Sequence, residues 1–328
     1  MITFYICIIL LLIFALLTST VSRLCDFTMQ RSLKIKGILA LLVIFSHCGS
    51  RIPIAKPWGA IAVGVFMFLT GYGLYASYLK KGTAYLDGFF RKRFVKLLPP
   101  LVIATVIYCV YLVFTGKATI FKIIENMCVG NVPIGATWYV YAILYFYVLF
   151  YISIKFGKGD FKREILNMTM GLVFYCFLIY ILHFGIWWSM SSPAICFGMA
   201  YCFYEKNIKL NYLKHQNLWL LTFLIGLSVY FLIIAGIDGL EVISLRFLMP
   251  IYWLISIPII LVVYKTGIAE NKLLNWLGGG SYEAYIVHDI FVCSLIGQKQ
   301  ISTVLIVVII LCLTYASAFL LKKLCGIF

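Results

Sequence analysis

Long apolar runs dominate this 328-residue chain and leave few folds open to it. A run of about 18–22 apolar residues can cross a bilayer as a helix, because a helix satisfies its own backbone hydrogen bonds. Runs of this kind lie near 2–22, 37–50 (a short one), 59–79, 96–115, 137–156, 167–184, 186–203, 217–236, 245–265, 281–297 and 301–321. They predict an all-α, polytopic transmembrane helical bundle with about ten core spans and an additional N-terminal helix.

Composition supports the same class. Hydrophobic residues make up 64% of the chain and charged residues only 12%, whereas soluble domains are usually about 45–50% apolar and about 25% charged. Little of the chain is left for a soluble domain. The segment 2–22 lacks the charged start and small-residue cleavage site of a signal peptide, so we expect a retained helix. We therefore divide the chain into 1–29, an extra helix with its linker, and 30–328, the membrane domain.

The basic residues are distributed unevenly between alternate loops. Of the 27 lysines and arginines, 21 fall in one set of loops and six in the other. Because cytoplasmic loops are enriched in Lys and Arg, this split predicts eleven spans in a plasma or inner membrane. The N-terminus would then lie outside and the C-terminus in the cytoplasm. The same split explains the net charge of +16 as topology rather than as nucleic-acid binding.

A lysine and a histidine share one of the shortest runs. Lys36 and His47 are eleven positions apart, about three helical turns, so they lie on one helix face about 16 Å from each other. An ionisable group inside a membrane suggests a functional site. The alternative is a buried histidine that is hydrogen-bonded to a neighbouring helix.

Two further motifs follow. The segment 64–73 holds three glycines and Thr70, which permits close helix approach or a kink, although ordinary small-residue packing is the alternative. The segment 91–100 places four cations before Pro99 and Pro100, which we expect in the first turns of a span. These cations can set topology, bind anionic lipid or clamp the phosphates of a nucleotide-bearing donor.

Polar residues also line one face of the run 281–297. Ser281, Tyr285 and His288 fall at i, i+4 and i+7, which suits a polar site or proton relay, or else a hydrogen-bonded helix seam. Trp138 stands at the start of the span 137–156, where aromatic residues commonly form an interfacial belt.

In this order, the elements resemble the acyltransferase-3 family of integral membrane acyltransferases, which modify cell-surface glycans and lipid-linked sugars. The resemblance runs from near Gln30 almost to the C-terminus. It rests on the basic-x10-His pattern of Lys36 and His47, the Phe-Phe-x-Leu-Ser-Gly-Tyr-like segment 66–72, the Arg-Arg-x-x-Arg-x-x-Pro-like segment 92–99, Trp138-Tyr139, and Ser-Tyr-x-x-Tyr-x-x-His at 281–288. The chain departs from these family patterns at five positions. Lys36, Lys92 and Lys96 stand where the family has arginine, Met67 stands for phenylalanine, and Thr70 stands for serine. A lysine lacks the bidentate fork of arginine, so the geometry of donor binding can differ.

The resemblance implies acyl transfer from cytoplasmic acetyl-CoA, as a co-substrate, to a hydroxyl of a surface polysaccharide or lipid-linked sugar. Such an enzyme needs no tightly bound cofactor and no metal, and its other partners are membrane lipids. His47 would be the general base, kept neutral by burial, and His288 a second catalytic group. The polyanionic donor would bind near three cations, with five supporting residues around the site. The cations are Lys36, Arg93 and Lys96, and the supporting residues are Thr70, Tyr72, Trp138, Ser281 and Tyr285.

Three alternatives remain at this point. A transporter or flippase of lipid-linked sugars would favour intramembrane carboxylates as proton carriers, and only Glu283 and Asp289 are near a predicted site. A structural membrane protein would use the histidines to hold helices together. A glycan polymerase would be expected to have a large polar outer loop, and the longest one here has about twenty residues.

Overall fold

The computed structural model describes residues 29–56, 58–128, 134–135, 137–215, 217–219, 221, 225 and 272–326. Every regular element in these residues is helical, as predicted. The elements are α2 (Met29–His47), η1 (Pro53–Ala55), α3 (Trp58–Lys81), η2 (Gly82–Leu86), α4 (Phe89–Phe114), α5 (Ile120–Cys128), α6 (Thr137–Gly157), α7 (Phe161–Ile181), α8 (Trp187–Met190), α9 (Ala194–Lys214), α12 (Lys272–Gly279), α13 (Ser281–Leu295) and α14 (Thr303–Leu324).

Five helical segments of the described residues are long and apolar enough to cross a membrane: Trp58–Leu86, Phe89–Phe114, Thr137–Gly157, Phe161–Ile181 and Thr303–Leu324. The α4 helix also leaves an apolar stripe uncovered, since Val102, Val106 and Val110 are 57%, 56% and 62% exposed. Such a stripe suits contact with lipid. The protein is therefore a helical membrane protein. The predicted helices at 2–22 and 245–265, and most of 217–236, lie outside the described residues.

Several predicted boundaries are wrong. The first described helix is α2, which begins at Met29 and ends at His47, so the span predicted at 37–50 is shifted. The run 186–203 is not one helix, because it contains the short α8 and only the start of α9. The α4 helix begins at Phe89, which places Pro99 and Pro100 in its interior instead of its first turns. Finally, α13 has 15 residues, fewer than the roughly 20 that a perpendicular crossing needs.

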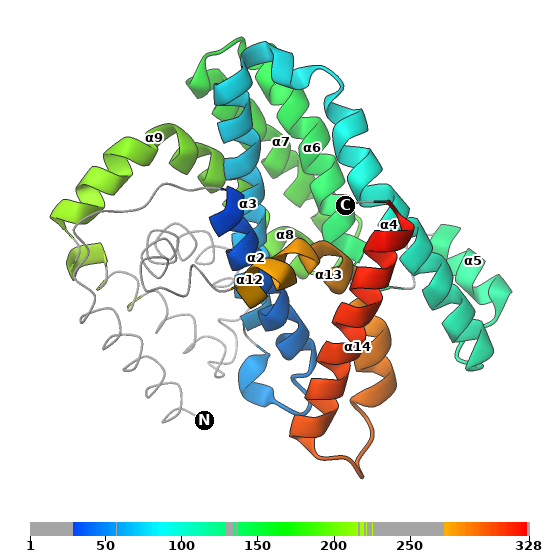
Figure 1. Ribbon diagram of the computed structural model, residues 1–328. Helices are drawn as coiled ribbons and strands as arrows, with labels where there is room; N and C mark the ends of the chain where they lie inside the picture. The colour runs from blue at the N-terminus through cyan, green and yellow to red at the C-terminus, as the bar shows by residue number, and fades with distance from the viewer. Residues whose placement is uncertain are drawn as a thin grey trace.

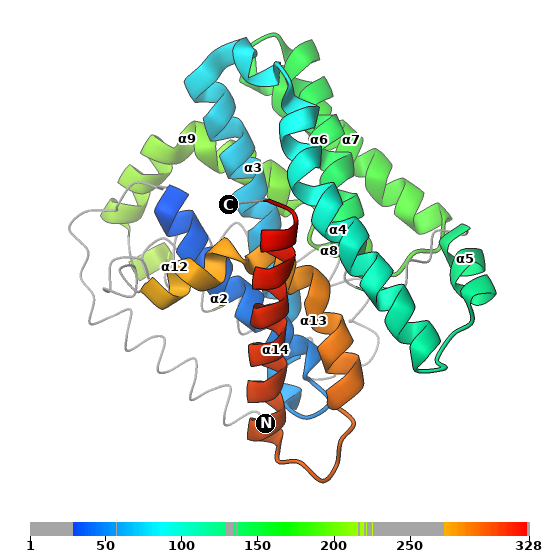
Figure 2. The same cartoon turned by 45° about the vertical axis from the view of Figure 1, so that its right-hand side comes forward.

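The centre of the bundle brings together segments from both ends of the chain. In Figures 1 and 2, α12 and α13 lie beside α2, and α14 lies along α13. The α5 helix lies at the edge of the molecule in both views. The site residues of the 30s and 40s and those of the 280s therefore meet in space.

The α3 and α9 helices cross closely through two glycines. A Cβ atom added at Gly71 would lie 2.0 Å from the carbonyl oxygen of Ile195, and one at Gly198 would lie 2.1 Å from that of Phe68. Only a residue without a side chain fits such an approach. The glycine-rich segment 64–73 thus packs a neighbouring helix, which is the simpler of its two interpretations.

Hydrogen bonds join the ends of helices that are far apart in the sequence. The Tyr78 hydroxyl near the end of α3 donates to Glu164 in the first turn of α7. The Lys322 ammonium near the end of α14 donates to the Gly279 carbonyl at the end of α12 at 2.8 Å. Arg51 donates to the Ile296 carbonyl, where the loop between α13 and α14 begins.

Candidate active site

The two predicted histidines meet around a carboxylate. His47 is the last residue of α2, and its Nδ1 lies 3.1 Å from Asp289 Oδ1 on α13. The Nε2 of His288 lies 3.4 Å from the same oxygen. The two imidazole rings pack edge to face with centroids 4.6 Å apart. Helices from opposite ends of the chain therefore build one cluster from His47, His288 and Asp289.

The burial of these groups differs from the prediction. The His47 side chain is 42% exposed, so the expectation that burial keeps it neutral is wrong. It stands at the end of its helix, where the following turn does not cover it. His288 is fully buried and Asp289 is 6% exposed. The orientation of the His47 ring is set by its contact with the Asp289 carboxylate. Because the ring is partly exposed, a substrate could reach it.

The hydrogen bonds determine which nitrogen carries the proton in each ring. The Nδ1 of His288 lies 2.5 Å from the carbonyl oxygen of Tyr285. Because a carbonyl can only accept, this Nδ1 must donate. The Nε2 of a neutral His288 is then an acceptor, and it has no hydrogen-bond partner among the residues that the structure describes. In His47 the Nδ1–H points to Asp289, which leaves its Nε2 as the basic atom.

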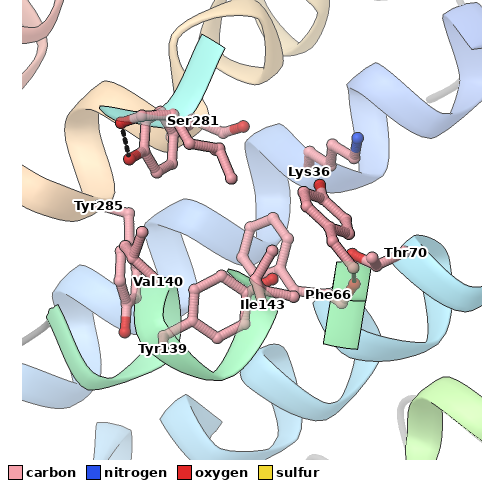
Figure 3. Close-up of a pocket in the computed structure, with 11 residues that line it drawn as sticks. Lys36, Phe66, Thr70, Tyr139, Val140, Ile143, Ser281 and Tyr285 are labelled. Atoms are coloured by element: carbon pink, nitrogen blue, oxygen red, sulfur yellow. Dashed lines mark hydrogen bonds between the residues drawn. The ribbon is translucent and has the colours of Figure 1, made fainter. Parts of the chain in front are cut away.

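A cavity of about 140 Å³ lies on the Lys36 side of this cluster. Its polar lining consists of Lys36, Thr70, Ser281 and four tyrosines, Tyr139, Tyr147, Tyr282 and Tyr285. Figure 3 shows Lys36 and Thr70 on one side of the cavity, with Ser281 and Tyr285 on the other. Four of the predicted site residues therefore meet here, contributed by α2, α3 and α13.

Tyr285 connects the cavity to the histidines. Its ring lies 5.2 Å from that of Tyr139 and 5.7 Å from that of His288, measured between centroids. Tyr139 lines the cavity as well. A group entering from the Lys36 side would therefore meet this pair of tyrosines before it reached His288.

The predicted donor-binding cations are placed differently from one another. Arg93 lies close enough to Lys36 for their like charges to repel, and its guanidinium lies 5.5 Å from the ring centroid of Tyr147 and 5.9 Å from that of Tyr85. It also donates to the Tyr85 hydroxyl. Lys96 is exposed three residues further along α4 and does not line the cavity. Lys36 and Arg93 thus form the inner pair, and Lys96 stands outside it.

Two predicted supporting residues lie away from the cavity. The Tyr72 hydroxyl donates to Glu205 at 2.7 Å, which turns it toward α9. Trp138 packs its ring against Tyr139 and Trp188, with centroids 6.0 and 6.2 Å away. Tyr72 therefore contributes to helix packing, and Trp138 packs against Tyr139, which lines the cavity.

Sequence reasoning did not identify Asp289 as the partner of His47. Asp289 follows His288 directly, but consecutive residues of a helix point about 100° apart, so adjacency predicts no shared contact. It also missed the buried Glu164, which accepts hydrogen bonds from the hydroxyls of Tyr75 and Tyr78 at 2.8 and 3.1 Å. Both contacts join residues that are far apart in the chain.

The cluster has the donor set of a metal site. One ligand atom from each of His47, His288 and Asp289 can be chosen so that all three lie within 4.8 Å of one another. Two imidazoles and a carboxylate are ligands that zinc accepts. The same three groups are also those of a carboxylate that orients a histidine, which accounts for the contact between His47 and Asp289 and leaves Nε2 of His288 without a hydrogen-bond partner.

An α-helical membrane protein with a histidine–carboxylate cluster beside a tyrosine-lined cavity has the parts of a membrane-embedded group-transfer enzyme. The family model of an acyltransferase domain matches residues 34–323. The chain therefore belongs to the acyltransferase-3 family and is an acyltransferase by that membership. Searches of curated proteins and of solved structures give no match.

Proposed function

We propose that the protein transfers an acetyl group from cytoplasmic acetyl-CoA to a hydroxyl of an extracytoplasmic or lipid-linked glycan. The observation that carries this proposal is the contact between His47 Nδ1 and Asp289 Oδ1. A carboxylate that accepts from one nitrogen of an imidazole orients the ring and stabilises the imidazolium that forms when the other nitrogen takes a proton.

The chemistry follows from that arrangement. The Nε2 of His47 removes the proton of the acceptor hydroxyl while the alkoxide attacks the thioester carbonyl. The carbon–sulfur bond then breaks, and the departing thiolate of coenzyme A takes the proton back from the imidazolium. Asp289 stays ionised throughout. The exposure of His47 supports this role, because an acceptor must reach the ring from outside the bundle.

The donor would enter from the opposite side. Lys36 and Arg93 supply positive charge beside the cavity, and the nucleotide part of coenzyme A is polyanionic. The hydroxyls of the cavity suit the amide groups of the pantetheine arm. In this proposal eleven spans cross the plasma or inner membrane, the N-terminus lies outside, and Lys36 faces the cytoplasm.

The test combines two measurements. Mass spectrometry of surface glycans, with and without the protein, should show a shift of one acetyl unit. In isolated membranes with labelled acetyl-CoA, His47→Gln should lower the rate about 10²–10⁴-fold at equal protein level. Glutamine keeps hydrogen bonding but cannot take the proton. A near-normal rate in this variant would move the base to His288.

A second function, a proton-coupled flippase for lipid-linked sugars, is favoured by one observation. Asp289 is a buried carboxylate between two imidazoles, which is also an arrangement for carrying protons. The glycan measurement separates the two functions, because a flippase would change the amount of surface glycan without adding acetyl groups to it.

A further inference from the structure

Arg51 joins the ends of the two helices that carry the histidine–carboxylate cluster. It lies four residues after His47, and its backbone N–H donates to the Cys48 carbonyl at 2.9 Å. Its guanidinium donates to the carbonyl of Ile296 at 2.8 Å, to that of Ile301 at 3.1 Å and to that of Gln298. These acceptors belong to the end of α13 and the loop that leads to α14.

The acceptors explain why an arginine suits this position. Ile296 is the C-cap of α13, where the last carbonyls lack partners within the helix and carry the negative end of its dipole. A guanidinium offers five N–H donors in a rigid fork and can satisfy three carbonyls at once. A lysine ammonium is a point charge on a flexible stem and holds no such fixed direction.

We infer that Arg51 is a positioning residue that sets the distance between His47 and Asp289. This inference rests on the proposed function, because its importance lies in the proton transfer assigned to His47. One turn of chain separates Arg51 from His47, and Ile296 lies seven positions after Asp289, at the end of the same helix. The three hydrogen bonds thus tie the end of α2 to the end of α13. Without them the two helix ends are free to shift against each other.

The first test reads the His47 environment without any acyl transfer. Diethyl pyrocarbonate modifies neutral imidazoles, and peptide mass spectrometry gives a rate for each histidine of the full-length protein in detergent. His47 is reachable, and exposed His183 serves as an internal reference. Asp289→Asn should slow the modification of His47, because a carboxylate at Nδ1–H makes Nε2 more nucleophilic. Arg51→Ala should slow it to the same extent, and Arg51→Lys to a smaller one.

The matched control is Lys299→Ala, which removes an exposed cation from the same loop. It should leave the modification rate of His47 unchanged. If Arg51→Ala and Arg51→Lys both leave that rate unchanged while Asp289→Asn lowers it, the positioning role is overturned. This result would stand whether or not the protein transfers acetyl groups.

The second test measures catalysis in a double-mutant cycle. A displacement of about 1 Å between reacting groups can cost about 10²-fold in rate. Arg51→Ala should therefore lower kcat about 10²-fold with the KM for acetyl-CoA unchanged, since the donor cavity lies on the Lys36 side. Arg51→Lys should recover part of the loss.

The cycle separates positioning from a general loss of folded protein. In an Asp289→Asn background the orienting carboxylate is already lost, so Arg51→Ala should cost less than about threefold more. If Arg51→Ala costs the same factor in both backgrounds, Arg51 acts on stability alone and the inference is wrong. If wild-type protein transfers no acetyl group, the proposed function fails, and the histidine modification still decides the role of Arg51.

Discussion

The orienting role assigned to Asp289 predicts a specific defect in Asp289→Asn. Asparagine has nearly the size of aspartate, so the packing around it should persist. Its amide has no net charge, and its NH2 group can donate to Nδ1 of His47 where the carboxylate accepted. That reversal would place the ring proton on Nε2, which is the atom that has to take a proton from the substrate.

The magnitude follows from the distance and the exposure of the pair. For charges 3.1 Å apart, Coulomb's law gives an attraction of about 1.3 kcal/mol at the dielectric constant of water and about 5.4 kcal/mol at an effective value of 20. His47 is partly exposed and Asp289 is buried, so an intermediate loss of about 3 kcal/mol is the expected cost. That free energy corresponds to roughly a 10²-fold fall in kcat.

The assay is acetyl transfer in isolated membranes, normalised to the amount of folded protein. Glu125→Gln is the control, because it neutralises another acid whose side chain is 65% exposed on α5. It should leave the rate unchanged. Asp289→Glu should lie between wild type and Asp289→Asn, since it keeps the charge at a changed distance. A near-wild-type rate for Asp289→Asn would refute the reasoning, because the 3.1 Å contact would then have no part in proton transfer.

Three other predictions concern the donor side and the packing of the bundle. Lys36→Ala should raise the KM for acetyl-CoA roughly tenfold or more, because it removes one charge-assisted hydrogen bond to the donor. Lys36→Arg should be tolerated, and steady-state kinetics over a range of acetyl-CoA concentrations measures both variants. Gly71→Ala should destabilise the fold by about 1–3 kcal/mol, because its Cβ would meet the backbone of Ile195, and thermal unfolding in detergent checks this. Tyr75→Phe removes a 2.8 Å hydrogen bond to buried Glu164 and should cost about 1.5–3 kcal/mol in the same assay, without changing the donor KM.

Helical periodicity was sufficient to predict part of the site. It placed Ser281 and Tyr285 on one face, and both line the cavity. The resemblance named Lys36 and Thr70 as further site residues, and the structure brings all four together at one cavity. This grouping depends on local geometry within a helix and on the order of motifs along the chain, whereas the roles of the four residues stay predictions.

Other features depend on which helix lies next to which. The partner of Tyr72 is Glu205, and the partner of His47 is Asp289, more than 100 residues away in each case. Hydropathy predicts that a helix exists but not where it ends, so it could not show that α2 stops at His47 and leaves the ring exposed. The predicted burial of this histidine failed for that reason.

The cluster places two histidines beside one carboxylate, and their contacts with it differ. In the resting state the Nδ1–H of His47 points to Asp289, whereas a neutral His288 turns the lone pair of its Nε2 toward the same oxygen at 3.4 Å. That second contact is unfavourable until a proton arrives on Nε2, when it becomes an ion pair. In the proposed reaction, a proton taken from the acceptor hydroxyl would therefore have two basic nitrogens next to one negative charge. In that reaction the exposed ring of His47 takes the proton, while the buried ring of His288 stays next to Asp289.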